Sequence, residues 1–157
     1  MDNKEKLLKY SVYYLSKYSS SKKNLEFVLK KKIRRLSEDK KIRYELYNEI
    51  ITILKKLESL NLLNDRLFTE SKIRFLLNQA KSQNYIKLYL VRKGVDIKLI
   101  DKEISQIYNS DKNIEKNNAL KFAKKKNLLK NNLDFEKSLS KMARAGFSYE
   151  TAKEVLK

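Results

Sequence analysis

Arginine and lysine side chains are the groups in this sequence whose type and spacing could do chemistry. Of the 37 basic residues, 30 are lysine and only 7 are arginine. A guanidinium group presents a planar fork of donors that grips a carboxylate or a phosphate through two hydrogen bonds. In a lysine-rich chain, each retained arginine is therefore the better candidate for a specific contact. We predict that an anionic partner is contacted by Arg34, Arg35, Arg74, Arg92, Lys93 and Arg144.

The residue types that catalysis and metal binding need are scarce. Cysteine and histidine are absent, which excludes thiol chemistry, histidine-based triads and the usual zinc sites. The two glycines, Gly94 and Gly146, are too few for a phosphate-binding glycine-rich loop. Asp111 and Glu115 stand four residues apart, a spacing too common on helices to propose a metal. We predict that the protein is not an enzyme and binds no metal or cofactor.

Tyrosine, which occurs ten times, offers one further kind of chemistry. The pairs Tyr13–Tyr14 and Tyr85–Tyr89 could stack on the bases of a nucleic acid. Tyrosines of this kind also line the rims of helix–helix contacts, with the hydroxyl in water. We favour the second interpretation.

The formal net charge of +18 also has two interpretations. An AT-rich genome would favour lysine in any protein, and the surface would then simply be solvated. Such a bias explains lysine over arginine better than it explains basic over acidic residues. We therefore favour a surface for a polyanion or an acidic protein partner.

Helical periodicity runs through the whole chain and would position these side chains. It predicts a first helix over about residues 4–17, a second capped by the hydroxyl cluster at residues 19–21, and a longer third that stops at residues 61–65. Later helices can be capped by Asn64 or Asp65, and by Ser82, Asp96 and Ser148. The apolar stripes of the successive helices are expected to include Leu8, Ser11, Leu15 and Tyr18; Leu25, Val28, Leu29 and Ile33; Leu46, Ile50, Ile53, Leu57 and Leu60; Phe68, Phe75 and Leu76; and Ile97, Ile100, Ile104 and Ile107.

One short pattern occurs twice, 52 residues apart. Residues 92–96 and 144–148 both read basic, any, glycine, apolar, cap, which is typical of a helical repeat. We predict an all-α fold of three units with three helices each, over residues 1–64, 65–110 and 111–157. Each unit has an excess of basic over acidic residues: 16 against 8, 9 against 5, and 12 against 6. A row of such units is elongated, with a cationic surface along its length.

The sequence shows no signal for a membrane. No apolar run approaches the roughly 18–20 residues that span a bilayer, and residues 1–10 lack the apolar core of a signal peptide. We expect a cytoplasmic protein without a membrane partner.

Four stretches resemble the RecX family of regulatory proteins, in the right order. Residues 57–68 are similar to that family's junction of leucine, asparagine and aspartate before an aromatic residue, and residues 86–96 to its Lys-Gly-Val segment. Residues 143–148 are similar to its C-terminal Arg-x-Gly-Phe-Ser motif, and residues 14–29 to its opening. The chain departs from the family pattern at Asn61, where glycine is usual, and at Thr69, where alanine is usual.

The resemblance implies three tandem three-helix repeats in a curved rod. It also implies a cytoplasmic modulator of the RecA recombinase that acts in DNA repair, recombination and the SOS response. Such proteins lodge in the groove of the RecA–single-stranded DNA filament and damp its ATP hydrolysis, strand exchange and co-protease activity. We expect the protein to be a monomer. Contact with the phosphates of single-stranded DNA stays open. The alternative is a non-specific nucleic-acid-binding helical protein.

Overall fold

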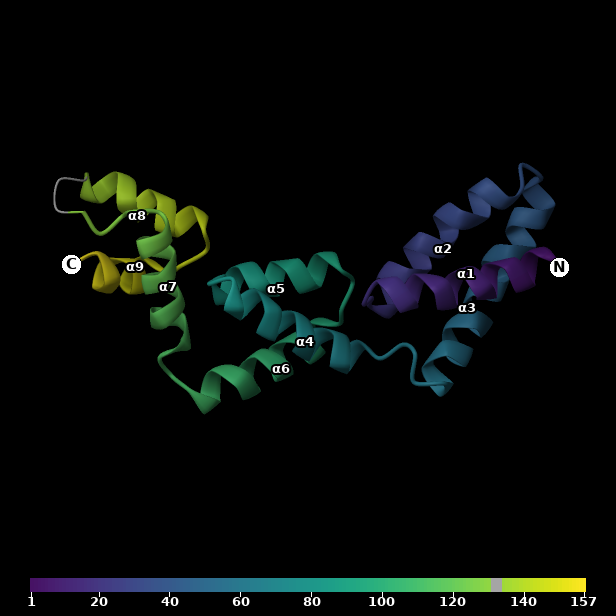
Figure 1. Ribbon diagram of the computed structural model, residues 1–157, viewed down its shortest axis with the longest axis horizontal. Helices are drawn as coiled ribbons and strands as arrows, with labels where there is room; N and C mark the ends of the chain where they lie inside the picture. Colours follow the sequence, from purple (N-terminus) through teal and green to yellow (C-terminus); the bar gives the residue numbers. More distant parts are fainter. Residues whose placement is uncertain (131–133) are drawn as a thin grey trace. The chain divides into compact units, whose positions relative to one another are not determined.

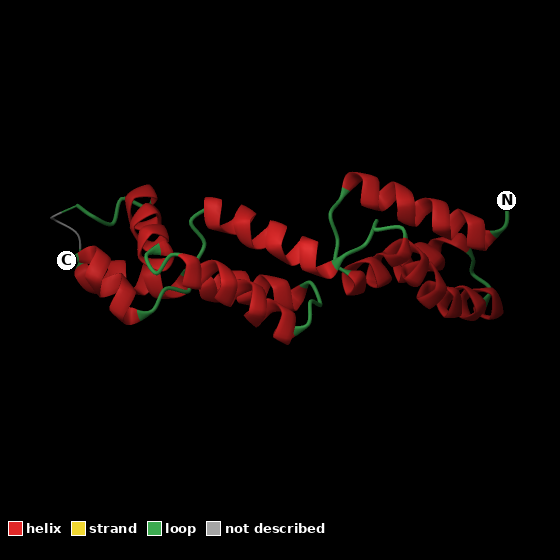
Figure 2. Cartoon of the chain, turned by 90° about the horizontal axis from the view of Figure 1, so that it is seen from below, coloured by secondary structure: helices red, strands yellow, loops and turns green. Residues whose placement is uncertain are grey.

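The computed structural model describes residues 1–130 and 134–157, and these residues form helices joined by short loops (Figure 2). No strand occurs among them, which confirms the all-α prediction. The helices are α1 (Asn3–Lys17), α2 (Lys22–Leu36), α3 (Lys40–Ser59), α4 (Asp65–Asn78), α5 (Gln83–Arg92), α6 (Ile97–Ser110), α7 (Ile114–Lys125), α8 (Phe135–Arg144) and α9 (Tyr149–Leu156). Figure 1 shows them in chain order.

Side-chain caps begin α2, α6 and α9 at residues that the sequence indicates. The caps of α1, α3 and α8 are Asp2, Asp39 and Asp134, which the sequence patterns do not single out. The Ser21 hydroxyl accepts from the Asn24 N–H, and the Ser148 hydroxyl accepts from the Thr151 N–H. Asp96 accepts from the Lys98 N–H at 2.8 Å. Each cap satisfies a backbone donor that the helix leaves unpaired, and is worth about 1 kcal/mol.

Backbone turns end several helices, and Asn61 shows how. Its φ is +55°, its N–H donates to the Glu58 carbonyl, and the next N–H donates to the Leu57 carbonyl. This is the Schellman arrangement, which needs a left-handed residue after the helix. Asparagine tolerates that conformation better than most other non-glycine residues, so Asn61 can form this turn where the family pattern has glycine.

The chain forms two compact units. Unit 1 comprises residues 1–68 and 93–95, and unit 2 comprises residues 69–92 and 96–157. In unit 1, α1, α2 and α3 pack against one another around a single core (Figure 1). Leu25, Leu29 and Ile33 lie four residues apart on α2 and are fully buried there.

In unit 2, α5 packs on α6, and α7 and α8 each pack on α9. The α7–α9 core contains Ala119, Ala123, Met142 and Phe147. The two alanines lie on α7 and leave room for the neighbouring helices. Burial of the larger side chains, Met142 and Phe147, contributes about 1.5–3 kcal/mol each to the free energy of folding. The boundaries at residues 64 and 110 that the sequence suggests for three repeats stay a prediction.

Several expected stripe positions are wrong. Tyr18, Leu60 and Phe75 are each more than half exposed, as is Ile97 at the start of α6. Tyr18 and Leu60 follow the last helical residue, where the helical period no longer fixes direction. Phe75 lies on the exposed face of α4, where the Lys72 ammonium lies 5.5 Å from its ring. Leu8 packs against the core as expected but is only partly buried, and its neighbour Leu7 is fully buried there.

Candidate partner-binding surface

A repeated junction fixes the N-terminal ends of α2 and α5. The Ser21 hydroxyl, at the start of α2, donates to the Lys93 carbonyl. The Ser82 hydroxyl, at the start of α5, donates to the Ala145 carbonyl at 2.8 Å. In both cases the accepting residue directly precedes a glycine. The sequence pattern that occurs twice is therefore the segment that binds the serine cap of another helix.

The glycines are required at these two junctions. Gly94 has φ +75°, and a Cβ there would lie 2.6 Å from the Cβ of Lys23. Gly146 has φ +93°, and a Cβ there would meet the Ser82 hydroxyl. Both positions therefore need a residue without a side chain, for conformation and for space.

A carboxylate completes each junction. The first amide of α2, Lys22 N–H, donates to the Asp65 carboxylate at 2.7 Å. The first amide of α5, Gln83 N–H, donates to both oxygens of Glu115, at 3.2 and 3.0 Å. Negative charge at a helix N-terminus is favourable because the helix dipole is positive there.

The carboxylate of Glu115, at the N-terminal end of α5, is half-buried. Burial raises its pKa, and the hydrogen bonds from Gln83 N–H and the Tyr108 hydroxyl oppose that shift. Burial and the Glu115 charge raise the pKa of Tyr108, which therefore stays protonated and donates at 3.2 Å. Glu115 thus anchors two groups. No cluster of three potential metal ligands occurs in residues 1–130 or 134–157.

The candidate contact residues in unit 1 lie at opposite ends of α2. Arg34 and Arg35 are exposed in its last turn. The Lys93 carbonyl contacts Ser21, the residue that caps its first turn. About 13 residues of helix separate these points, which is roughly 20 Å at 1.5 Å per residue. Unit 1 therefore does not bring its three candidates into one site.

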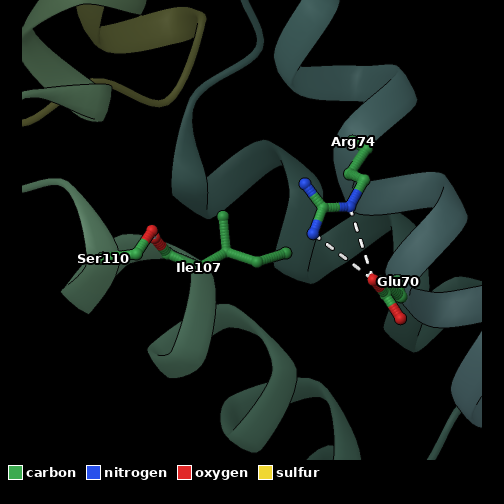
Figure 3. Close-up of polar contacts among 4 residues, drawn as sticks. All are labelled: Glu70, Arg74, Ile107 and Ser110. Carbon is green, nitrogen blue, oxygen red and sulfur yellow. Dashed lines mark hydrogen bonds and ion pairs between the residues drawn. The ribbon is translucent and has the colours of Figure 1, made fainter.

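The candidates in unit 2 are also separated. Exposed Arg74 pairs with Glu70 along α4, with its guanidinium 3.3 Å from Oε1 (Figure 3). Exposed Arg92 ends α5, whereas Arg144 directly precedes the residue that contacts Ser82 at the other end of α5. About ten helical residues, roughly 15 Å, lie between those two ends of α5.

Arg43 shows that a retained arginine also has structural uses. Its Nε donates to the Ser37 carbonyl at 2.6 Å, and Nη2 donates to the Arg34 carbonyl at 3.1 Å. These bonds satisfy carbonyls at the C-terminal end of α2, which the helix leaves without partners. The sequence contains no signal that distinguishes this role from a partner contact.

Tyrosine pairs in α1 form an aromatic row. The rings of Tyr10, Tyr14 and Tyr18 follow one another with centroids 6.4 and 5.0 Å apart. Tyr10 and Tyr14 also pack against the unit 1 core, which agrees with the interpretation of such residues as rims. Exposed Tyr13 instead carries Lys17 over its ring, at 5.9 Å.

Comparison with known proteins decides the family. Regulatory protein RecX of Clostridium botulinum (strain Alaska E43 / Type E3) is 33% identical over 144 residues, which cover 84% of this chain. The chain belongs to the RecX family. Regulatory protein RecX of Lactococcus lactis subsp. lactis (strain IL1403) is 36% identical over 93 residues, or 59% of this chain. The matches span 66% of the first RecX protein and 33% of the second, so the chain corresponds to part of each.

Solved RecX structures share the fold. The crystal structure of RecX from Lactobacillus salivarius matches 98% of this chain and 94% of its own, with a TM-score of 0.70 and 23% identity. A second crystal structure, of regulatory protein RecX, matches 98% of this chain and 71% of its own, with a TM-score of 0.71 and 22% identity. These matches confirm the expected RecX-like arrangement of three-helix repeats. No family model matches the chain.

Both RecX relatives are named as regulatory proteins, in agreement with the prediction of a non-enzymatic protein. None of the helices in the described part of the chain is long and apolar enough to cross a membrane.

Proposed function

We propose that this protein binds the RecA recombinase on single-stranded DNA and damps the activities of the filament. The observation that carries the proposal is the similarity to a RecX regulatory protein over 84% of the chain. The net charge of +18 supports it, since a filament of protein and DNA presents both carboxylates and phosphates. The protein would act as a monomer in the cytoplasm, by binding alone.

The proposed contacts are the six predicted residues, Arg34, Arg35, Arg74, Arg92, Lys93 and Arg144. Because α2 separates Arg34 and Arg35 from Lys93 by roughly 20 Å, they would meet different places on the partner. Several spaced contacts suit a filament, which offers the same surface repeatedly. The three-repeat division at residues 64 and 110 is part of this proposal.

The experiment is a titration of the protein into RecA with single-stranded DNA and ATP, with hydrolysis as the readout. A dose-dependent fall in the rate supports the proposal, and an unchanged rate at micromolar excess overturns it. The double variant Arg34→Ala/Arg35→Ala tests one contact pair. Its matched control is Lys40→Ala/Lys41→Ala, which removes two exposed cations close by in the same unit. Loss of inhibition in the arginine variant alone supports a specific contact.

A second candidate function is non-specific nucleic-acid binding, which the excess charge favours. Binding to single-stranded DNA in the absence of RecA discriminates it. Contacts to several phosphates would lower the logarithm of affinity by about 0.7 per phosphate for each tenfold rise in salt. A steep fall of DNA affinity with salt would favour this alternative, provided that the protein leaves ATP hydrolysis unchanged when RecA already covers the single-stranded DNA.

A further inference from the structure

A surface groove lies between the end of α7 and the last turns of α8, within unit 2. It has a volume of about 440 Å³ and is lined by Phe122, Lys126, Lys141, Arg144 and Ala145. Phe122 and Ala145 supply an apolar floor, and the three cations stand around it. Arg144 and Ala145 belong to the repeated junction motif, whereas Phe122, Lys126 and Lys141 do not. We call these five residues the α7–α8 groove.

The floor of the α7–α8 groove is firmly supported. The Phe122 ring packs on the Phe147 ring with centroids 5.6 Å apart and planes tilted by 50°. Phe147 is buried, and so is Met142 on the neighbouring face of α8. Aromatic pairs in this geometry hold one another in place. The groove is therefore a preformed hollow, which lowers the cost of filling it.

The cations of the groove lack acidic partners in the described residues. Lys126, Lys141 and Arg144 are exposed, and none of them forms an ion pair within residues 1–130 and 134–157. Elsewhere in unit 2 exposed lysines do pair, as Lys116 does with Glu154 at 2.6 Å.

Two more lysines extend this charge, and one carboxylate lies beside them. Lys130 and Lys137 line an adjoining hollow that shares Lys126 and Lys141 with the groove. Asp134, which also lines that hollow, accepts from the N–H groups of Glu136 and Lys137 as the cap of α8. The residues that line the two hollows therefore keep an excess of positive charge over negative charge.

The ends of helices favour cations, because the helix dipole is negative at the C-terminus. That effect accounts for lysine and arginine in the last turns of α7 and α8. It does not account for an uncovered apolar hollow between them. Apolar floor and unpaired cations together fit a ligand that carries an apolar group and negative charge side by side.

We propose that the α7–α8 groove binds an acidic peptide segment of a protein partner. One aliphatic or aromatic side chain of the peptide lies over Phe122, and flanking carboxylates pair with Lys126, Lys141 and Arg144. Arg144 can hold one carboxylate through two hydrogen bonds. The Phe122 ring is half-buried and packs on Phe147, so it offers a compact aliphatic side chain a contact surface. A nucleic-acid base can also stack on an aromatic ring, and the oligothymidylate competition below tests that occupant. The inference goes beyond the proposed RecA regulation. The two proposals share Arg144, but the peptide test below uses no RecA, so either can fail alone.

The test is fluorescence anisotropy with a labelled twelve-residue peptide of Asp and Glu around one central Leu, at about 0.15 M salt. We expect saturable binding, and at least tenfold weaker binding when the central Leu is replaced by Ser. Lys126→Glu/Lys141→Glu should weaken binding of the Leu peptide at least tenfold. The matched control Lys121→Glu/Lys125→Glu removes the same charge from exposed positions on α7 that do not line the groove, and should change affinity less than threefold.

Three results would overturn the proposal. The first is equal affinity for the Leu and Ser peptides, which would leave only net-charge attraction. The second is equal weakening by the two lysine pairs. The third is displacement of the peptide by a twelve-nucleotide oligothymidylate that binds more tightly, which would make the groove a nucleic-acid site. The comparison of the two peptides uses the unmodified protein, so it stands even if a variant fails to fold.

Discussion

The Ser82 hydroxyl donates a 2.8 Å hydrogen bond to the Ala145 carbonyl, 63 positions further along the chain. The same hydroxyl accepts from the Tyr85 N–H and so caps α5. The Ser82 side chain thus caps α5 and also binds the loop that precedes α9. Ser21 does both tasks for α2 and the loop before α6. The junction is a single device used twice.

Gly146→Ala should destabilise unit 2 by about 1–3 kcal/mol, because the new Cβ meets Ser82 and the left-handed φ strains alanine. Urea unfolding followed by circular dichroism measures this. The double variant with Ser82→Ala, which removes the clashing hydroxyl, should cost less than the sum of the two single changes. Strict additivity would show that the close approach at Gly146 is unimportant.

Glu115→Gln should remove one component of the pH dependence of stability. Burial raises the pKa of Glu115 above its ordinary value of 4.5, so the folded state holds this proton at pH values where the unfolded state has lost it. Between those two pKa values, stability rises as the pH falls, and below 4.5 this contribution is constant. Thermal unfolding from pH 4 to pH 8 should give a smaller acid-side gain for the variant. An identical profile in both proteins would contradict this assignment.

Asn61→Gly should stabilise unit 1, and Asn61→Ala should destabilise it, each by about 0.5–1 kcal/mol. Residue 61 has φ +55°, which glycine adopts freely and alanine does not. Both changes delete the same amide side chain, so opposite signs isolate the backbone effect. Unfolding midpoints in urea provide the measurement, and two shifts in the same direction would refute the argument.

Arg43→Ala should lower stability by about 1–3 kcal/mol, because it leaves the Ser37 and Arg34 carbonyls without their charged donor. Arg74→Ala should change it by less than about 0.5 kcal/mol, since an exposed pair along one helix contributes little. Thermal denaturation of the two variants side by side is the check. A large loss in Arg74→Ala would mean that α4 depends on this ion pair.

The sequence by itself determined the helices, several of their caps and the family. Apolar spacing and caps act within a few residues, so Asp96 and Ser148 could be assigned without a structure, and the cap of α2 could be narrowed to residues 19–21. Helical spacing does not predict the exposure of residues that follow a helix end. For this reason the prediction that Tyr18 and Leu60 are buried is wrong. The repeated basic-x-Gly pattern was visible, but its task, docking on a serine cap, was not.

Only the tertiary structure decided which side chains meet. Nothing near Glu115 in the sequence points to Gln83, 32 positions away, and nothing near Phe122 points to Arg144. Hydrogen bonding and charge act over a few ångströms in space, whatever the distance along the chain. Composition therefore shows that the protein is cationic. Only the fold distinguishes Arg43, which has a structural role, from the unpaired cations of the α7–α8 groove.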